Sequence, residues 1–406
     1  MPSYSEQTMR FLFSSLPAHG HAYPLIPTAL AVREAGHEVL FVTGKTFCEN
    51  IRAFGLDAVD AGITIAEGLV VANEGPYDRR TVTCERETLL RAQTFGSVLP
   101  RIFLEELTPL LRGWRPDLVV HDPANFGASL AAHRCGIGAV CHGYGLVVDE
   151  NDVAIGECLS RFTEQVGLPW PGGFARGGSD PYLDVYPVSL QGPQHVTTAP
   201  RFPQRSVAVD APDSPTEPVR RLRALRGERA VVYLTLGTGF GTASVLRQAL
   251  DGLLPLGVDV IVSAGPTVDV RDLGPVPDSV LLFDWVPQAA VLRQADLAVH
   301  HGGSGTTLAV LSAGLPQLIV PQGADQFVNT AAVVDGGAGL CLFPSSFSAD
   351  TVGTCVRRLL DDTAVRTRAG EVAAEMAAMP SPAENLPVLE ELAASGRGDR
   401  SPAERP

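Results

Sequence analysis

One pattern recurs along most of this chain: a short apolar segment, a turn rich in glycine, and a periodic helical segment that leads to the next apolar one. In the first part of the sequence, apolar segments lie at residues 9–14, 37–44, 116–122 and 137–143, with helical segments at 25–35 and 128–134. Parallel strands need crossover connections of this kind, whereas antiparallel strands are joined by short hairpins. The pattern therefore predicts an α/β fold with parallel sheets.

The same pattern restarts after an interruption. Residues 206–221 combine three prolines with acidic and small polar residues, a composition typical of a connection between domains. Beyond them, apolar segments follow at residues 230–240, 258–265, 279–287, 295–303 and 317–321, with a helical segment at 246–254. We therefore predict a Rossmann-like domain over 1–205, a linker over 206–221, a second Rossmann-like domain over 222–380, a helix over 381–394 able to pack back on the first domain, and a disordered tail over 395–406.

Two such domains enclose a cleft, and open parallel sheets bind ligands outside the carboxyl ends of their strands. Two further stretches, residues 63–95 and 147–194, hold apolar and aromatic side chains in what we interpret as loops, the second as a loop-and-helix excursion that includes Trp170. Loops of this composition are expected to contact a bulky, mostly apolar ligand.

The charge balance excludes some classes of partner. The formal net charge is −14, and only Lys45 among the 31 Lys and Arg residues is a lysine. Nucleic acids and anionic membranes attract basic surfaces, so neither is expected as a partner. The chain starts without a basic segment before a long apolar stretch, and its seven cysteines follow no metal-ligand spacing. We expect a soluble cytoplasmic protein with free thiols and a small-molecule substrate.

The segment from His300 to Phe327 carries the clearest chemical signal. A strand runs into the glycine-rich turn 301–305 (His-Gly-Gly-Ser-Gly), and a helix is expected to begin near Thr306. Backbone N–H groups at such a turn and the positive end of the helix dipole can bind a diphosphate without a lysine. A glycine turn alone is also compatible with an ordinary tight connection between strand and helix.

This segment resembles the donor signature of the inverting, two-domain (GT-B) glycosyltransferases, which include plant flavonoid, macrolide-inactivating and antibiotic-decorating enzymes. In that family a His-x-Gly-x-x-Ser/Thr stretch binds diphosphate and a later Pro-x-x-x-Asp-Gln run holds sugar hydroxyls. The matching residues here are His301, Gly303 and Thr306, and then Pro321, Asp325 and Gln326. The resemblance implies two Rossmann-like domains facing each other across a cleft. Its donor-binding turn comprises His301, Gly302, Gly303, Ser304, Gly305 and Thr306.

Two further elements complete the expected donor site. The family's Trp-x-Pro-Gln element stacks on the nucleobase, and the residues here are Trp285, Val286 and Gln288 around Pro287. An indole face suits a pyrimidine, and Val286 can offer backbone hydrogen bonds to its edge. A second glycine turn, with Gly237, Thr238 and Gly239, resembles the family loop that touches the phosphates, although by itself it is a weak signal. A tryptophan at a strand end can equally be a core residue.

The catalytic pair is expected in the first domain. His19 and His21 follow the first strand, where a histidine can act as a general base near neutral pH. The family base precedes small residues and a proline, which matches His21 directly, while His19 is a neighbour of structural or pocket-shaping role. The resemblance pairs this base with an aspartate at the end of the PDLVVHD strand, namely Asp122. Asp117 is a solvated or capping residue in this interpretation, and Asp149 and Asp152 are alternatives to Asp122.

One departure from the family pattern concerns the nucleotide. The plant-like signature has a ribose-binding glutamate three residues after the signature Ser/Thr, and the residue here is Ala309. A methyl group leaves a 2′-hydroxyl without a partner, which favours thymidine diphosphate (TDP) sugars over uridine diphosphate (UDP) sugars.

The sequence thus predicts a hexosyl-type inverting transfer to a hydroxyl of a natural-product aglycone, with TDP-sugar or UDP-sugar as co-substrate and no metal or other cofactor. A homodimer is left open. Three alternatives are a UDP-sugar-dependent macrolide- or phenol-modifying transferase, a catalytically silent auxiliary protein, and a dinucleotide-dependent oxidoreductase. The last lacks a G-x-G-x-x-G after the first strand, and the auxiliary protein would be expected to have lost His21, Asp122 or the Asp325–Gln326 pair.

Overall fold

The computed structural model describes residues 8–79, 81–146, 153–168, 180–192, 199–225, 227–239 and 241–398. Contacts divide the chain into two compact units. The first holds the described residues of 1–185, 193–204 and 380–406, and the second those of 186–192 and 205–379. The predicted α/β fold with two parallel-sheet domains is confirmed.

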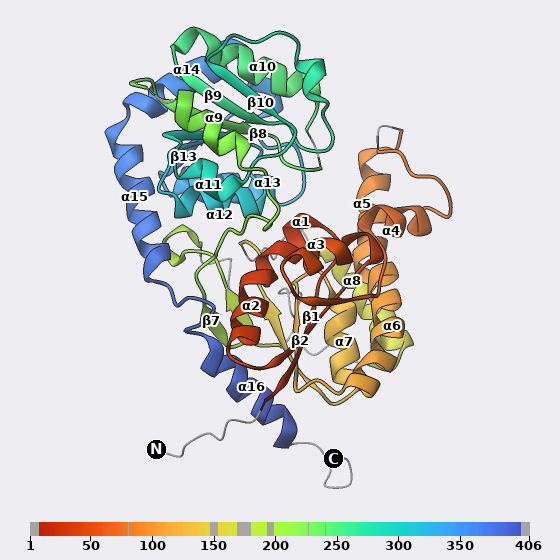
Figure 1. Cartoon of the computed structure of the whole chain (residues 1–406). Coiled ribbons are helices and arrows are strands. Elements are labelled where there is room, and N and C mark those ends of the chain that lie inside the picture. Colours follow the sequence, from red (N-terminus) through yellow and green to blue (C-terminus); the bar gives the residue numbers. More distant parts are fainter. Residues whose placement is uncertain are drawn as a thin grey trace. The chain divides into compact units, whose positions relative to one another are not determined.

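The first unit is built around a seven-stranded parallel sheet in the order β3-β2-β1-β4-β5-β6-β7. Figure 1 labels its strands β1, β2 and β7. Its strands are β1 (Arg10–Ser14), β2 (Glu38–Thr43), β3 (Asp57–Asp60), β4 (Leu118–His121), β5 (Gly138–His142), β6 (Tyr182–Asp184) and β7 (Arg201–Pro203). The order reverses between β1 and β4, because β2 and β3 are added on one side of β1 and β4 to β7 are added on the other side. Such a switch point is where α/β sheets bind ligands.

Helices connect the strands of this sheet, except for the last of them, which follows the second unit in the sequence. They are α1 (His19–Ala22), α2 (Ile26–Glu34), α3 (Cys48–Ala53), α4 (Ile65–Ala72), α5 (Cys84–Gln93), α6 (Leu99–Trp114), α7 (Phe126–Arg134), α8 (Val153–Gln165) and α16 (Leu386–Gly398). On α6, Phe103, Leu107 and Leu111 recur at helical spacing, are fully buried and belong to one core cluster with Leu12 and Val119 of the sheet. Each such side chain contributes about 1.5–3 kcal/mol on burial.

The second unit has a six-stranded parallel sheet in the order β10-β9-β8-β11-β12-β13. Its strands are β8 (Val231–Thr235), β9 (Asp259–Ser263), β10 (Val280–Phe283), β11 (Leu297–His300), β12 (Gln317–Ile319) and β13 (Gly339–Cys341). Its helices are α9 (Glu217–Leu225), α10 (Ala243–Leu253), α11 (Gln288–Leu292), α12 (Ser304–Ser312), α13 (Gln326–Asp335), α14 (Ala349–Asp361) and α15 (Thr363–Ala378). The switch point of this sheet lies between β8 and β11.

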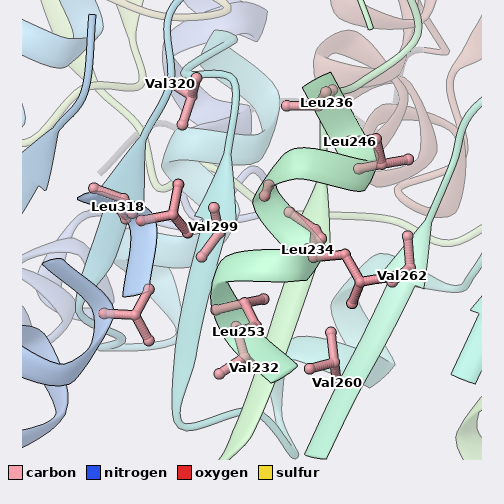
Figure 2. Close-up of a cluster of buried hydrophobic side chains, with 14 of the residues drawn as sticks. Val232, Leu234, Leu236, Leu246, Leu253, Val260, Val262, Val299, Leu318 and Val320 are labelled. Carbon is pink, nitrogen blue, oxygen red and sulfur yellow. The ribbon is translucent and has the colours of Figure 1, made fainter. Parts of the chain in front are cut away.

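The central strand β8 is buried on both faces. Val232 and Leu234 of β8 and Leu236 just after it pack with Leu246 and Leu253 of α10 in one cluster (Figure 2). Val231 and Tyr233, which point the other way, pack in a second cluster with Val286, Val291 and Ala309. A strand covered on both faces needs a continuous apolar run, which explains the segment VVYLT.

The predicted apolar segments all become strands, but the interpretation of residues 63–95 as loop was wrong. Two helices lie there, α4 and α5, and the turn at Thr94–Val98 that joins α5 to α6 is a π-helix. Thr64 and Glu67 form a capping box at the start of α4, since the side chain of each accepts from the backbone N–H of the other. That Thr-x-x-Glu signature is readable in the sequence.

Several boundaries also differ from the prediction. Residues 186–192, expected in the first domain, belong to the second unit, because Ser189 N–H donates to Glu375 and Arg368 donates to the Ser189 hydroxyl. The expected linker 206–221 is also part of the second unit, and α9 begins within it at Glu217. Helix α16 contacts β4 and β5 and continues past residue 394 to Gly398. Trp170, Asp149 and Asp152 lie outside the described residues.

No helix among the described residues is both long and apolar enough to cross a membrane.

Candidate functional site

The side chains of His21 and Asp122 meet at the switch point of the first sheet. His21 lies in α1, shortly after β1, and Asp122 directly follows β4, the strand paired with β1. The carboxyl ends of neighbouring parallel strands lie at the same edge, so both residues are brought there by the sheet. His21 Nδ1 is 3.1 Å from Asp122 Oδ1.

Asp122 is held by the backbone around it. Its Oδ2 accepts from Leu16 N–H at 2.7 Å and its Oδ1 accepts from Ala124 N–H at 2.7 Å, and the side chain is fully buried. A carboxylate that accepts on both oxygens requires the proton of the histidine ring to be on Nδ1. The Nε2 atom of His21 is then an acceptor, which is the state a general base needs.

The ring of His19 packs against two aromatic rings of the same unit. The ring of His19 lies 5.1 Å from the ring of Tyr23 and meets that of Phe47 edge-on at 4.9 Å. Burial lowers the pKa of His19. Asp117 lies at the opposite end of its strand, where it accepts from Arg10 N–H at 2.9 Å. Tyr144, which the sequence did not predict as part of the site, meets the ring of His21 edge-on, with 4.9 Å between the ring centroids.

A second group that sequence reasoning missed lies beside Asp122. The carboxylate of Asp180 accepts from His121 Nε2 at 3.0 Å, from the Ser129 hydroxyl at 2.5 Å and from His133 Nε2 at 2.8 Å. Burial alone would raise the pKa of Asp180, but the hydrogen bonds from His121 and His133 hold it well below its usual range. His121 Nδ1 in turn lies 2.9 Å from the Asp122 carbonyl oxygen. No spacing in the sequence links residue 180 to residues 121–133.

In the second unit the glycine turns after β8 and β11 meet at the switch point. A Cβ atom on Gly237 would lie 2.5 Å from His301 Nε2, and one on Gly303 would lie 2.4 Å from the same atom. The ring of His301 is therefore held between two glycines. Burial lowers its pKa to about 4, with the charge of Asp325 acting in the opposite direction. Its buried Nδ1 has no hydrogen-bond partner among the described residues.

The side chain of His300, the last residue of β11, holds the turn that follows this strand. Gly302, with φ +89°, donates its N–H to His300 Nδ1 at 3.0 Å, and His300 Nε2 donates to the Gln317 side-chain oxygen at 2.8 Å. Burial lowers the pKa of His300 to about 3, so its ring is neutral. The amide of Asn329 donates to the Gly302 carbonyl oxygen at 2.9 Å.

Helix α12 begins at Ser304, two residues before the predicted start. Ser304 N–H and its hydroxyl both donate to Asp325 Oδ2, at 3.2 and 2.6 Å. Of the turn amides considered for the diphosphate, those of Gly302 and Ser304 are thus already bonded inside the protein. The amides of Gly303, Gly305 and Thr306 stand at the turn and the first turn of α12, where helical N–H groups have no partner in the helix.

Asp325 and Gln326 lie at the start of α13, and Asp325 contacts the glycine turn through Ser304. Asp325 Oδ2 also accepts from Asn329 at 3.2 Å. Gln326 is 2% exposed, and its side-chain oxygen accepts from Gln322 N–H at 2.7 Å and Gly323 N–H at 3.2 Å. These contacts organise the loop before α13, so any contact of Gln326 with a sugar would come from its amide nitrogen.

The expected nucleobase element lies between β10 and α11. Trp285 is 39% exposed, whereas Val286 is buried in the cluster that also holds Ala309. The amide nitrogen of Gln288 lies 3.3 Å from both the Tyr233 hydroxyl and the Thr306 hydroxyl. Gln288 thereby links the nucleobase element to the first turn of α12. Thr238 is exposed beside Gly237.

Among the described residues, no group of three or more His, Cys, Asp or Glu side chains is arranged to hold a metal ion.

The chain matches both halves of one known family. The N-terminal domain of the erythromycin biosynthesis protein CIII-like family matches residues 30–160, and its C-terminal domain matches residues 247–392. The chain belongs to this family. It is a glycosyltransferase of the type found in antibiotic biosynthesis, with the GT-B fold that the resemblance implied.

Relatives of this glycosyltransferase act on several natural products. The elloramycin glycosyltransferase ElmGT of Streptomyces olivaceus is 32% identical over 93% of this chain and 95% of its own. The 3-alpha-mycarosylerythronolide B desosaminyl transferase of Saccharopolyspora erythraea is 30% identical over 97% of this chain and 100% of its own. The structure of the Streptomyces sp. SF2575 glycosyltransferase SsfS6 complexed with thymidine diphosphate superimposes with a TM-score of 0.75 at 27% identity, covering 94% of this chain and 99% of that chain.

Proposed function

We propose that this glycosyltransferase moves a deoxysugar from TDP to a hydroxyl group of a bulky natural-product aglycone, with inversion at the sugar C1 atom. His21 Nε2 takes the proton of the acceptor hydroxyl. The acceptor oxygen then forms a bond to C1 while the bond between C1 and the diphosphate oxygen breaks. TDP leaves with that electron pair from the opposite face.

The observation that carries the proposal is the 3.1 Å contact between His21 and a fully buried, backbone-held Asp122. This arrangement leaves Nε2 free of a proton and stabilises the imidazolium that forms during the reaction. General bases of this kind accelerate reactions by roughly 10²- to 10⁴-fold. The proposed reaction uses no metal and no cofactor besides the donor.

The donor assignment is supported by the turn at His301. Its glycines let the backbone approach a diphosphate, and the amides of Gly303, Gly305 and Thr306 provide the electrostatic stabilisation of the leaving group. TDP is the proposed nucleotide for two reasons. Ala309 offers no hydrogen bond to a ribose 2′-hydroxyl, and the structural relative SsfS6 was solved with thymidine diphosphate. A UDP-sugar donor is the second candidate.

Thermal-shift measurements of the full chain with TDP, UDP and NAD test the donor class. TDP should raise the melting temperature more than UDP does, and NAD should have no effect. The reverse order of TDP and UDP would favour the second candidate, and a response to NAD alone would sink the proposal. Mass spectrometry of products from TDP-sugar and UDP-sugar panels with polyketide, macrolide and phenolic aglycones then identifies the transfer.

The His21→Ala variant tests the base. It should lose transfer by roughly 10²-fold or more while it keeps the thermal shift with TDP. His37→Gln is the matched control, because His37 lies in the same unit but precedes β2, at the opposite edge of the sheet. Transfer at the wild-type rate by His21→Ala would remove His21 from the mechanism. A wild-type chain that binds TDP but transfers from no donor would favour the silent auxiliary protein.

A further inference from the structure

Asp210 connects the segment between β7 and α9 to the nucleobase element. Its Oδ1 accepts from Ala289 N–H at 3.1 Å, and its Oδ2 accepts from Ala290 N–H at 3.2 Å. These are amides in the first turn of α11, whose N-cap residue is Pro287 and has no capping side chain. The carboxylate of Asp210, 79 and 80 residues away in sequence, supplies the acceptor that the missing cap would have provided.

Helix α11 is held at a second point by Gln288. Its amide nitrogen lies between the hydroxyls of Tyr233 on β8 and Thr306 on α12. Burial is the main cause that raises the pKa of Tyr233, and the negative charge of Asp210 raises it further. Asp210 and Gln288 therefore fix the short helix α11 from two sides.

We propose that Asp210 is a positioning residue for nucleobase recognition, an inference that rests on the proposed function. By bonding both first-turn amides of α11, its carboxylate sets the position of Trp285 and Gln288 relative to the first turn of α12. The stacking surface and the phosphate-binding amides can then engage one nucleotide together. Without Asp210, α11 loses these two backbone hydrogen bonds and keeps the Gln288 contacts and its packing.

This role differs from a merely structural one in a measurable way. A residue that only stabilised the second unit would, when replaced, weaken the binding of every ligand of the donor site. A residue that positions the nucleobase element weakens the binding of a nucleotide but leaves the binding of its phosphates alone unchanged. The comparison of TDP with inorganic pyrophosphate therefore separates the two roles.

The experiment measures dissociation constants of the full chain for TDP and for pyrophosphate by calorimetry. Asp210→Ala should raise the Kd for TDP about tenfold, or about 1.4 kcal/mol, with the Kd for pyrophosphate unchanged. Asp213→Ala is the matched control, because Asp213 is an exposed aspartate of the same segment. It should leave both constants at the wild-type values.

Asp210→Asn provides a second test that does not depend on the folding of the alanine variant. Its side-chain oxygen can accept from only one of the two amides, so its Kd for TDP should fall between those of the wild type and Asp210→Ala. An unchanged Kd for TDP in both variants, or an equal loss for TDP and pyrophosphate, would overturn the positioning role. A wild-type chain that binds no TDP would overturn the proposed function itself.

Discussion

The imidazole of His301 occupies the space in front of Gly237 that a side chain at position 237 would need. Gly237 has φ +74°, and a Cβ atom built on it would lie 2.5 Å from both Cε1 and Nε2 of the histidine. The first glycine turn of the second unit therefore determines where the histidine of the other turn can lie. The two turns behave as one element, although they are separated by the whole of β9 and β10.

Gly237→Ala should disturb this arrangement in two ways. The left-handed backbone costs about 1–2 kcal/mol of folding stability for a residue with a Cβ atom, and the new methyl group displaces the His301 ring. We expect TDP binding to weaken roughly tenfold, as measured by calorimetry. Gly370→Ala is the control, because Gly370 lies in α15 of the same unit, nothing lies within 4 Å of a Cβ atom there, and its φ is not in the left-handed region. Equal TDP affinity in the two variants would contradict the proposed contact between the turns.

Asp122→Asn should lower the transfer rate while the fold is retained. An asparagine has only one side-chain oxygen, so its NH₂ group must replace one of the two carboxylate oxygens. In one orientation the NH₂ group faces the backbone N–H of Leu16, and in the other it faces the backbone N–H of Ala124 and the ring of His21. The ring then loses its preferred tautomer, and we expect kcat to fall by roughly 10²- to 10⁴-fold. The measurement is the rate of product formation at saturating donor. TDP affinity, measured alongside, should stay the same because Asp122 lies in the other unit.

Acid should destabilise the protein through two buried histidines. Burial lowers the pKa of His142 to about 4 and that of His300 to about 3. The unfolded chain binds a proton near pH 6.5 at each position while the folded chain does not, so stability is present above that pH and is lost as the pH falls. Each residue should account for about 2 kcal/mol between pH 7.5 and pH 5.

Urea unfolding at several pH values measures this loss. In His142→Gln the free energy of unfolding should depend less steeply on pH between 6.5 and 5 than in the wild type. The same pH dependence in variant and wild type would show that His142 is charged in the folded protein.

Asp180→Asn should be strongly destabilising, by about 3–5 kcal/mol at neutral pH, because it removes the charged partner of two histidines in a buried group. The hydrogen bond with Asp180 raises the pKa of His133 against the effect of burial. That pKa, followed by NMR, should therefore fall in the variant. Asp57→Asn, at an exposed position of β3, should change neither quantity. An unchanged His133 pKa in Asp180→Asn would show that the ion pair is absent in solution.

The sequence predicts the features that depend on a strand itself or on the turn directly after it. The apolar runs at β1, β4, β8 and β11 predict the two sheets, since strands covered on both faces must be apolar throughout. His21, Asp122 and the glycine turns follow those strands directly, so strand placement alone brings them to the sheet edges. The roles assigned to them toward substrates remain predictions.

What the sequence did not predict depends on contacts between distant segments. Asp180 and Asp210 lie in stretches that read as loop or linker, and each acts on residues about 50 to 80 positions away. Helix α5 has a mainly polar sequence, CERETLLRAQ, with only Leu90 and Ala92 buried, so its apolar periodicity is weak. The bonds of Gln326 to the backbone of residues 322 and 323 are likewise invisible before the loop is folded.

Helix α16 belongs to the first unit although it follows the whole of the second in sequence. Asn385, just before α16, donates to the Pro203 carbonyl oxygen, and Glu390 on it binds His37. A ribosome must therefore finish the second unit before the first can close its last contacts. For the same reason, a chimera that exchanges nucleotide specificity between relatives should replace residues 186–192 together with 205–379 and leave α16 with its native partner strands.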